Sequence, residues 1–161
     1  VEFRHDSWMQ EEVYEHVRSL GLGFVNVDLP GLRSLPRPSS VVTSPDAYVR
    51  LHGRNAAQWH NPSSAGERYD YRYSDEELDA WVMRVKELRE VTQTVYVFTN
   101  NCHKGSSFVD ALRLKQRLGL PVRSGLEADA TLFSTQTPED RVHALSQRVA
   151  ASRTRDPGRG G

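Results

Sequence analysis

Residues 48–55 read Tyr48-Val49-Arg50-Leu51-His52-Gly53-Arg54-Asn55. Because side chains alternate along a β-strand, Val49 and Leu51 share one face while Arg50 and His52 share the opposite face. Gly53 then ends the strand and opens a loop. A strand with an apolar outer face and functional groups at its carboxyl end is typical of an α/β barrel or a doubly wound sheet.

Strands and helices are predicted to alternate along the chain. We expect strands at residues 1–4, 24–29, 48–52 and 94–99, and helices at 9–20, 74–92 and 108–118. Ser74 and Glu77 form a capping box at the start of the second helix. Its buried stripe is predicted to consist of Leu78, Trp81, Val82, Val85 and Leu88. Such alternation predicts a parallel sheet with right-handed crossovers.

Each predicted strand carries polar residues on one face near its carboxyl end. They are Glu2 and Arg4, Asn26 and Asp28, Arg50 and His52, and Asn100. In a closed barrel these side chains would converge at the mouth, where the sites of such barrels lie. This pattern favours a (β/α)8 TIM-type barrel, of which this chain supplies four strands, over one wing of an open sheet.

Length, charge and cysteine content limit the classes of protein. With 161 residues, 37% of them hydrophobic, the chain is predicted to form one domain. A formal net charge of zero gives no overall attraction to nucleic acid or to an anionic membrane. The single cysteine, Cys102, excludes an internal disulfide and suits a reducing compartment. Since no apolar run approaches the roughly 18 residues of a membrane span, we expect a cytoplasmic protein.

The segment from residue 53 to residue 73 shows neither helical nor strand periodicity. Loops of that length inside a compact domain are uncommon, and those that are ordered often cover a site. We interpret this one as an ordered flap; the alternative is a loop that covers a barrel end without any chemical role. Tyr69, Tyr71, Trp59 and Arg54 are candidates for stacking on a base or a sugar ring.

Three groups are candidates for acid/base chemistry. Glu2 and Asp28 supply carboxylates, and His52 supplies an imidazole whose ordinary pKa lies near neutrality. Structural ion pairs and a hydrogen-bonded structural histidine are the alternatives for these residues. The guanidinium groups of Arg4, Arg50 and Arg54 are predicted to bind a phosphate or carboxylate group of a substrate.

A divalent metal ion is a further alternative. Glu2, Asp28, His52, His5 and His103 have suitable ligand chemistry, although the chain has no HExxH motif and no pair of cysteines. The pattern favours an anion pocket without a cofactor over a metal centre.

Several segments, in this order and spacing, resemble the YecE-like family, known as domain of unknown function 72. They are Val1-Glu2-Phe3-Arg4-His5 with Ser7-Trp8, Val27-Asp28 with Pro30, Tyr48 to Arg54, Tyr69-Asp70-Tyr71 with Tyr73-Ser74, and Tyr96-Val97-Phe98 with Asn100-Asn101. The resemblance implies a (β/α)8 barrel and places this chain on its fifth to eighth strands. Within these segments Trp8, Asn100 and Asn101 join the arginines and tyrosines as candidate substrate-binding residues.

The resemblance also divides the chain. Residues 1–118 are expected to form the carboxyl-terminal half of the barrel, and residues 119–161 a divergent tail with a short helix at 138–150 followed by disorder. Half a barrel leaves two open sheet edges and an exposed inner face. We therefore expect the missing amino-terminal half-barrel on the natural chain, in preference to association of two copies or a poorly folded fragment.

Two functions of different classes remain. The first is an enzyme that binds a small anionic, phosphate-bearing ligand or a nucleic acid at the mouth of the barrel. His52 would act there with Glu2 or Asp28 as acid and base. The second is a non-catalytic ligand-binding or scaffold barrel whose polar interior is a structural network of ion pairs. The family name does not define an activity, so the resemblance leaves the reaction open.

Overall fold

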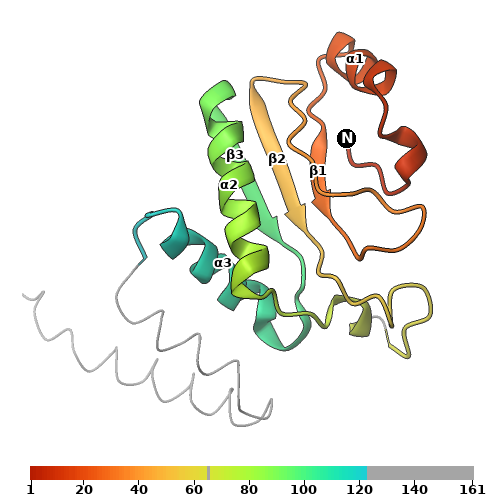
Figure 1. Ribbon diagram of the computed structural model, residues 1–161, viewed down its shortest axis with the longest axis vertical. Coiled ribbons are helices and arrows are strands. Elements are labelled where there is room, and N and C mark those ends of the chain that lie inside the picture. Colours follow the sequence, from red (N-terminus) through yellow and green to blue (C-terminus); the bar gives the residue numbers. More distant parts are fainter. Residues whose placement is uncertain (65, 123–161) are drawn as a thin grey trace, which may run out of the picture.

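A computed structural model of the protein describes residues 1–64 and 66–122 (Figure 1). Its strands are β1 (Val25–Asp28), β2 (Asp46–Leu51) and β3 (Thr94–Thr99), and its α-helices are α1 (Glu11–Ser19), α2 (Asp75–Val91) and α3 (Ser106–Arg117). Three 3-10 turns are η1 (Asp6–Trp8), η2 (Glu67–Tyr69) and η3 (His103–Gly105). The strands lie in the order β1-β2-β3 and are all parallel, which confirms the predicted α/β class and parallel sheet. The helix predicted at 138–150 lies outside the described residues.

The helix α2 begins as the sequence predicts. The hydroxyl of Ser74 accepts a hydrogen bond from the Glu77 amide at 3.2 Å, and the Glu77 carboxylate accepts one from the Ser74 amide at 2.9 Å. Its buried residues are the five of the predicted stripe, Leu78, Trp81, Val82, Val85 and Leu88. The face that α2 turns to the sheet is therefore fixed by local sequence alone.

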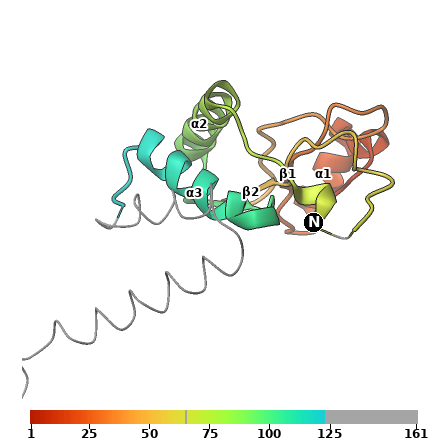
Figure 2. The same ribbon diagram turned by 90° about the horizontal axis from the view of Figure 1, so that it is seen from below.

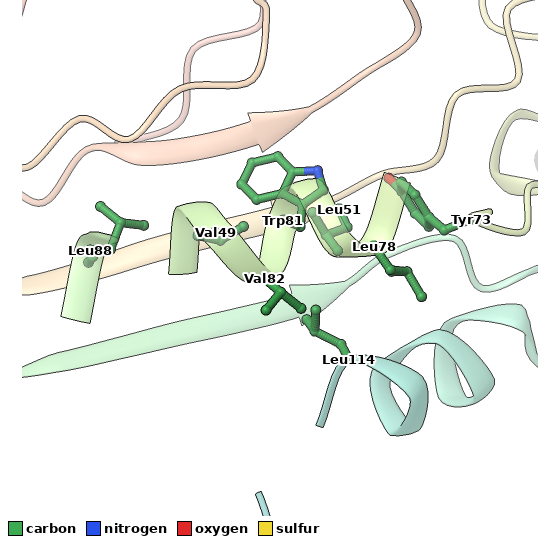
Figure 3. Packing of buried hydrophobic residues seen from close by; sticks show 9 residues of the cluster. Val49, Leu51, Tyr73, Leu78, Trp81, Val82, Leu88 and Leu114 are labelled. Carbon is green, nitrogen blue, oxygen red and sulfur yellow. The ribbon is translucent and has the colours of Figure 1, made fainter. Parts of the chain in front are cut away.

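The main core lies between α2 and the sheet (Figure 3). Ala47, Val49 and Leu51 of β2 are almost fully buried there, together with Trp81 of α2 and Leu114 of α3. Burying each large apolar side chain contributes about 1.5–3 kcal/mol to stability. Figure 2 shows α2 and α3 side by side. The predicted apolar face of β2 is thus confirmed as the face that the helices cover.

The register of the sheet corrects the expected position of two polar residues. Asn26 pairs with Val49 and Asp28 with Leu51, and laterally paired residues point to the same side of a sheet. Asn26 and Asp28 therefore lie on the face that the helices cover. We expected them on the same face as Arg50, and this expectation is wrong. Alternation fixes which residues share a face within one strand, but the register between neighbouring strands is a non-local property.

The predicted strand at residues 1–4 is not a strand. The Val1 carbonyl accepts a hydrogen bond from the Val25 amide at 2.9 Å, and the Val1 amino group donates to the Gly23 carbonyl. Residues 1–4 form no regular strand with β1, and the Phe3 ring stacks on that of Trp8 with centroids 5.1 Å apart. The described part of the chain thus has three strands where four were expected.

On the side of the sheet away from the helices lie three large rings, here called the aromatic face: Tyr48, Tyr96 and Phe98. Tyr48 pairs with Tyr96 across the ladder, and both ring contacts of Tyr48, with Tyr96 and with Phe98, have centroids 5.2 Å apart. Their exposed fractions are 37%, 43% and 44% for Tyr48, Tyr96 and Phe98. Large aromatic side chains on a parallel sheet are ordinarily covered, since such sheets are buried on both faces.

The helices also bear on the expectation that the chain contains no membrane span. Within residues 1–64 and 66–122, no helix has the combined length and apolar character that crossing a bilayer requires.

Candidate functional site

A charged cluster at the carboxyl end of β2 is centred on Glu2 and comprises Glu2, Arg4, Arg50 and His52, here called the Glu2 cluster. Arg50 Nη1 donates to Glu2 Oε2 at 2.6 Å, and Arg4 Nε donates to Glu2 Oε1 at 2.7 Å. The side chain of Glu2 is 14% exposed, whereas those of Arg50 and Arg4 are 31% and 47% exposed. Two guanidinium groups against one carboxylate leave one positive charge in excess. The structure thus brings together four of the residues singled out from the sequence.

The imidazole of His52 lies against this carboxylate and is fully buried. Its Nε2 is 3.2 Å from Glu2 Oε1, although the two groups lack the alignment of a hydrogen bond. On the other side of the ring, Nδ1 lies 3.5 Å from the amide nitrogen of Asn100. Burial lowers the pKa of His52 to about 4; Arg4 and Arg50 act in the same direction, while Glu2 opposes them. The ring is therefore uncharged at neutral pH.

Glu2 is ionised in this setting. Burial favours its protonated form, but hydrogen bonds from Arg4 and Arg50 outweigh that effect and lower the pKa of the carboxyl group. An uncharged imidazole next to a carboxylate can share a proton that a ligand supplies, because in the tautomer with its hydrogen on Nδ1 both groups present a lone pair.

Asp28 belongs to a separate network. Its fully buried carboxylate accepts hydrogen bonds from Arg54 Nη2 at 2.8 Å and from Arg54 Nε at 2.9 Å. Arg54 Nη1 donates to Glu77 at 2.9 Å, and the same Glu77 oxygen accepts from the Tyr71 hydroxyl at 2.7 Å. Two carboxylates share one guanidinium here, so the network has an excess of negative charge. Arg54 therefore does not converge with Arg4 and Arg50, and Asp28 does not join His52.

The segment 53–73 packs on the molecule through its aromatic residues. Trp59 is 6% exposed and joins a second core cluster with Val27 of β1, while the Arg68 guanidinium lies over its indole ring at 5.7 Å. The ring of Tyr69 lies 6.4 Å from that of His52 and interacts with Arg4. Tyr69 thus borders the Glu2 cluster, whereas Tyr71 borders the Asp28 network.

Next to the Glu2 cluster an open groove of about 370 Å³ runs across the aromatic face. It is lined by Glu2, Val25, Tyr48, Arg50, Phe98 and Asn100. Sequence reasoning did not single out Val25, Tyr48 or Phe98 as site residues. Their signal was the period-two pattern of β2 and β3, which sets Tyr48, Tyr96 and Phe98 on the face of Arg50 once the strands are paired.

Most of the chain matches a known protein family. The family model described as protein of unknown function DUF72 matches residues 1–137. The chain belongs to the DUF72 family. This assignment confirms the resemblance found in the sequence, because the YecE-like family and DUF72 are the same family.

Relatives of this DUF72 chain are longer than the segment they share with it. The UPF0759 protein YunF of Bacillus subtilis (strain 168) is 32% identical over an alignment of 117 residues, and the match covers 66% of this chain and 42% of that protein. A DUF72 family crystal structure from Thermotoga maritima is 45% identical with a TM-score of 0.71, covering 74% of this chain and 45% of that chain. Another, from Enterococcus faecalis V583, is 27% identical with a TM-score of 0.65, covering 76% and 47% respectively. This chain therefore spans less than half the length of each of these three relatives.

Two predicted binding residues of this DUF72 chain have other contacts. Trp8 stacks on Phe3 with the rings inclined by 17° and remains 49% exposed. Asn101 is fully buried and donates through its amide to Asp110 at 2.7 Å and to the Tyr71 carbonyl at 2.8 Å. Of the two adjacent asparagines, Asn100 lines the groove and Asn101 ties a loop to α3.

The candidate metal ligands lie apart. In the described ranges 1–64 and 66–122, no three histidine, cysteine, aspartate or glutamate side chains come together in a manner that could hold a metal ion. His5 contacts Asp6 at 3.3 Å, and His103 lies 3.6 Å from Asp70. Glu2 and His52 are candidates whose side chains contact each other.

Proposed function

We propose that this chain supplies the carboxyl-terminal half of a (β/α)8 TIM-type barrel, whose mouth binds a phosphate-bearing anionic substrate and performs acid/base chemistry on it. The observation that carries the proposal is the convergence of Arg4 and Arg50 on the single carboxylate of Glu2, next to the uncharged imidazole of His52.

The barrel is supported by the two faces of the sheet. One face packs on helices, and the other carries three large aromatic rings that remain more than one third exposed. A closed barrel covers that inner face with side chains of the remaining strands. The amino-terminal half-barrel would then cover the deeper level of this face, at Tyr48 and Tyr96, and leave Phe98, which is level with Arg50, at the mouth. The relatives have room for that half, since this chain spans less than half of each.

Anion binding is supported by the charge of the Glu2 cluster. With His52 uncharged, Arg4 and Arg50 exceed Glu2 by one positive charge, and both arginines are partly exposed. A guanidinium group fits a phosphate through two parallel hydrogen bonds, and such bonds strengthen where water is scarce. Arg54 is left out of this pocket because its donors already serve Asp28 and Glu77.

The acid/base pair is Glu2 with His52. The two arginines keep the pKa of Glu2 low in the absence of a ligand. A phosphate group that draws these arginines to itself weakens that effect, so the carboxylate becomes a stronger base where the substrate is bound. In the tautomer with its hydrogen on Nδ1, His52 presents a lone pair at Nε2, 3.2 Å from the carboxylate, and can then share the proton that Glu2 accepts. Asp28 takes no part, because it is enclosed with Arg54.

A non-catalytic ligand-binding or scaffold barrel is the second candidate. It is favoured by one observation, the complete burial of the His52 side chain, which keeps the ring from direct contact with solvent. The two functions differ in what His52→Ala changes. The catalytic function requires lost turnover in a folded protein, whereas the scaffold function requires lost stability with ligand affinity unchanged once the protein is folded.

The test of anion binding is a thermal-shift screen of the full-length protein with inorganic phosphate, sugar phosphates and short oligonucleotides, each with and without a divalent cation. A ligand that binds the folded state raises its melting temperature by mass action. We expect a phosphate-bearing ligand to raise it, and Arg50→Met to abolish the shift.

Arg89→Met is the matched control, because it removes the same charge from an exposed position on α2, on the helix-covered side of the sheet. The shift should survive in that variant. If no ligand raises the melting temperature and Arg50→Met merely lowers it, the arginines are structural and the proposal fails.

A further inference from the structure

We propose that the phosphate bound at Arg4 and Arg50 belongs to a nucleotide, free or at the end of a single strand, and that its base stacks on Phe98. This inference rests on the proposed function, since it names the class of substrate for the same site. It is carried by an exposed aromatic ring held next to an arginine in one groove.

The sheet sets the two side chains at the same level. Phe98 of β3 pairs with Arg50 of β2, so both point into the groove from neighbouring strands. Neighbouring strands lie about 4.8 Å apart, and a base on Phe98 is therefore within reach of a phosphate at Arg50 through a ribose. Asn100, two residues beyond Phe98 on the same wall, presents an amide that can donate to and accept from a base edge.

Phe98 is both exposed and held in place. It is 44% exposed, and its ring stacks on Tyr48 with a centroid distance of 5.2 Å and an interplanar angle of 16°. Tyr48 in turn contacts Tyr96, which lies two residues before Phe98 on β3 and so further from the carboxyl end of the strand. A ring that is backed by another ring loses little conformational freedom when a base stacks on it.

The aromatic residues of the 53–73 segment are less available for this task. Trp59 is buried under Arg68, and the Tyr71 hydroxyl is bound to Glu77. Arg54, which was also expected to stack, has its guanidinium group bound to Asp28. We therefore assign the stacking role predicted for those residues to Phe98.

The dimensions favour a small ligand. The groove measures about 370 Å³, toward the lower end of the roughly 300–1,000 Å³ of small-molecule sites. The chain has no net charge, and the basic stripe that tracks a nucleic acid backbone is therefore not expected from its composition. A single nucleotide fits these limits, whereas a duplex does not.

The experiment measures affinity by calorimetry on the full-length protein, comparing AMP, ribose 5-phosphate and a 5′-phosphorylated single-stranded oligonucleotide. Stacking of one base on an aromatic side chain contributes about 1–3 kcal/mol, which corresponds to a gain in affinity between about 5-fold and about 150-fold. We expect the affinity for AMP to exceed that for ribose 5-phosphate by a factor in this range. Phe98→Leu should remove this advantage while leaving the affinity for ribose 5-phosphate unchanged.

Two variants guard against a general effect on folding. Phe98→Tyr keeps an aromatic ring and should keep the preference for AMP, and Tyr96→Leu removes a ring of the same face at the next level and should also keep it. Tight binding of the oligonucleotide that depends on Phe98 would identify a strand end as the source, and binding of AMP alone would identify a free nucleotide.

Two results would overturn the inference and tell it apart from the proposed function. If ribose 5-phosphate binds through Arg50 but AMP binds no tighter, the phosphate site stands and the nucleotide is wrong. If neither ligand binds, the phosphate site itself is wrong, and the inference falls with it.

Discussion

The uncharged state of His52 has a consequence for stability. Its pKa falls from the ordinary 6.5 to about 4, and burial is the largest cause of this fall. Above pH 6.5 the ring is uncharged in both the folded and the unfolded chain, so it adds no pH dependence there. Between pH 6.5 and pH 4 the unfolded chain takes up a proton that the folded chain does not. The free energy of unfolding should therefore fall as the pH is lowered through this window, by at most about 3 kcal/mol.

Chemical denaturation of the full-length protein at a series of pH values measures this slope. His52→Asn should flatten it, because asparagine does not titrate, and His16→Gln should leave it unchanged, because His16 lies exposed on α1. Glu2 contributes in a lower range: its pKa is also lowered, so the stability it provides is lost only as the pH falls below about 4.5. An equal slope in the wild type and in His52→Asn would contradict the prediction.

At the scale of elements, the Asp28 network joins β1, the loop after β2 and the start of α2. Arg54 reaches the fully buried Asp28 on one side and Glu77 of α2 on the other. Arg54→Met leaves a buried carboxylate without its partner, and breaking such a pair costs about 3 kcal/mol even at the lower end of the usual range. We expect a loss of that order in the free energy of unfolding, measured by denaturant titration.

The control for this prediction is Arg72→Met, which removes an equal charge from an exposed position. Surface substitutions of that kind usually change stability by less than about 0.5 kcal/mol. Adding Asp28→Asn to Arg54→Met should recover part of the loss, since it removes the unpaired charge. A cost of Arg54→Met as small as that of the control would show that the network does not hold these elements together.

The contrast between α2 and β1 shows which parts of the fold could be predicted from the sequence. The capping box and the stripe of α2 depend on residues three and four positions apart, so a single sequence contains the whole signal. The face of Asp28 depends on pairing with a strand more than twenty residues away, and local alternation carries no information on that register. For the same reason, the alternation in residues 1–4 indicated a strand although only Val1 reaches β1.

The residues of the candidate site show the same contrast between local sequence signals and non-local strand pairing. Arg50 and His52 were assigned to one face of one strand, and Glu2 to the same site through its polar position in a neighbouring segment. Arg54 was grouped with them because it follows closely in sequence, but beyond Gly53, with its φ of 88°, the chain turns and sends its side chain to Asp28. The role of Phe98 required the ladder between β2 and β3, which composition does not reveal.

At the scale of the whole molecule, the aromatic face tests whether the sheet is the inside of a closed barrel. Tyr96 is 43% exposed in this chain and is remote from the carboxyl end of the strand. In the full-length protein, Tyr96→Lys should lower the free energy of unfolding by more than about 3 kcal/mol if other strands cover the position, because an unpaired charge would be buried.

An exposed face gives a different result: the same substitution would then cost less than about 1 kcal/mol. Met83→Lys is the matched control, since Met83 is 66% exposed on the outer side of α2 and should tolerate a charge. A small cost at both positions would exclude the covered barrel interior.

The ion pair between Glu2 and Arg50 joins residues 48 positions apart in the sequence. Closing a loop of that length costs conformational entropy before the contact stabilises anything, and contacts of this kind form slowly. The pair also needs β1 and β2 already in register, because Val1 docks beside β1 while Arg50 lies on β2. During synthesis Glu2 is made well before Arg50, so an anion-binding pocket here would form only after β1 and β2 have paired.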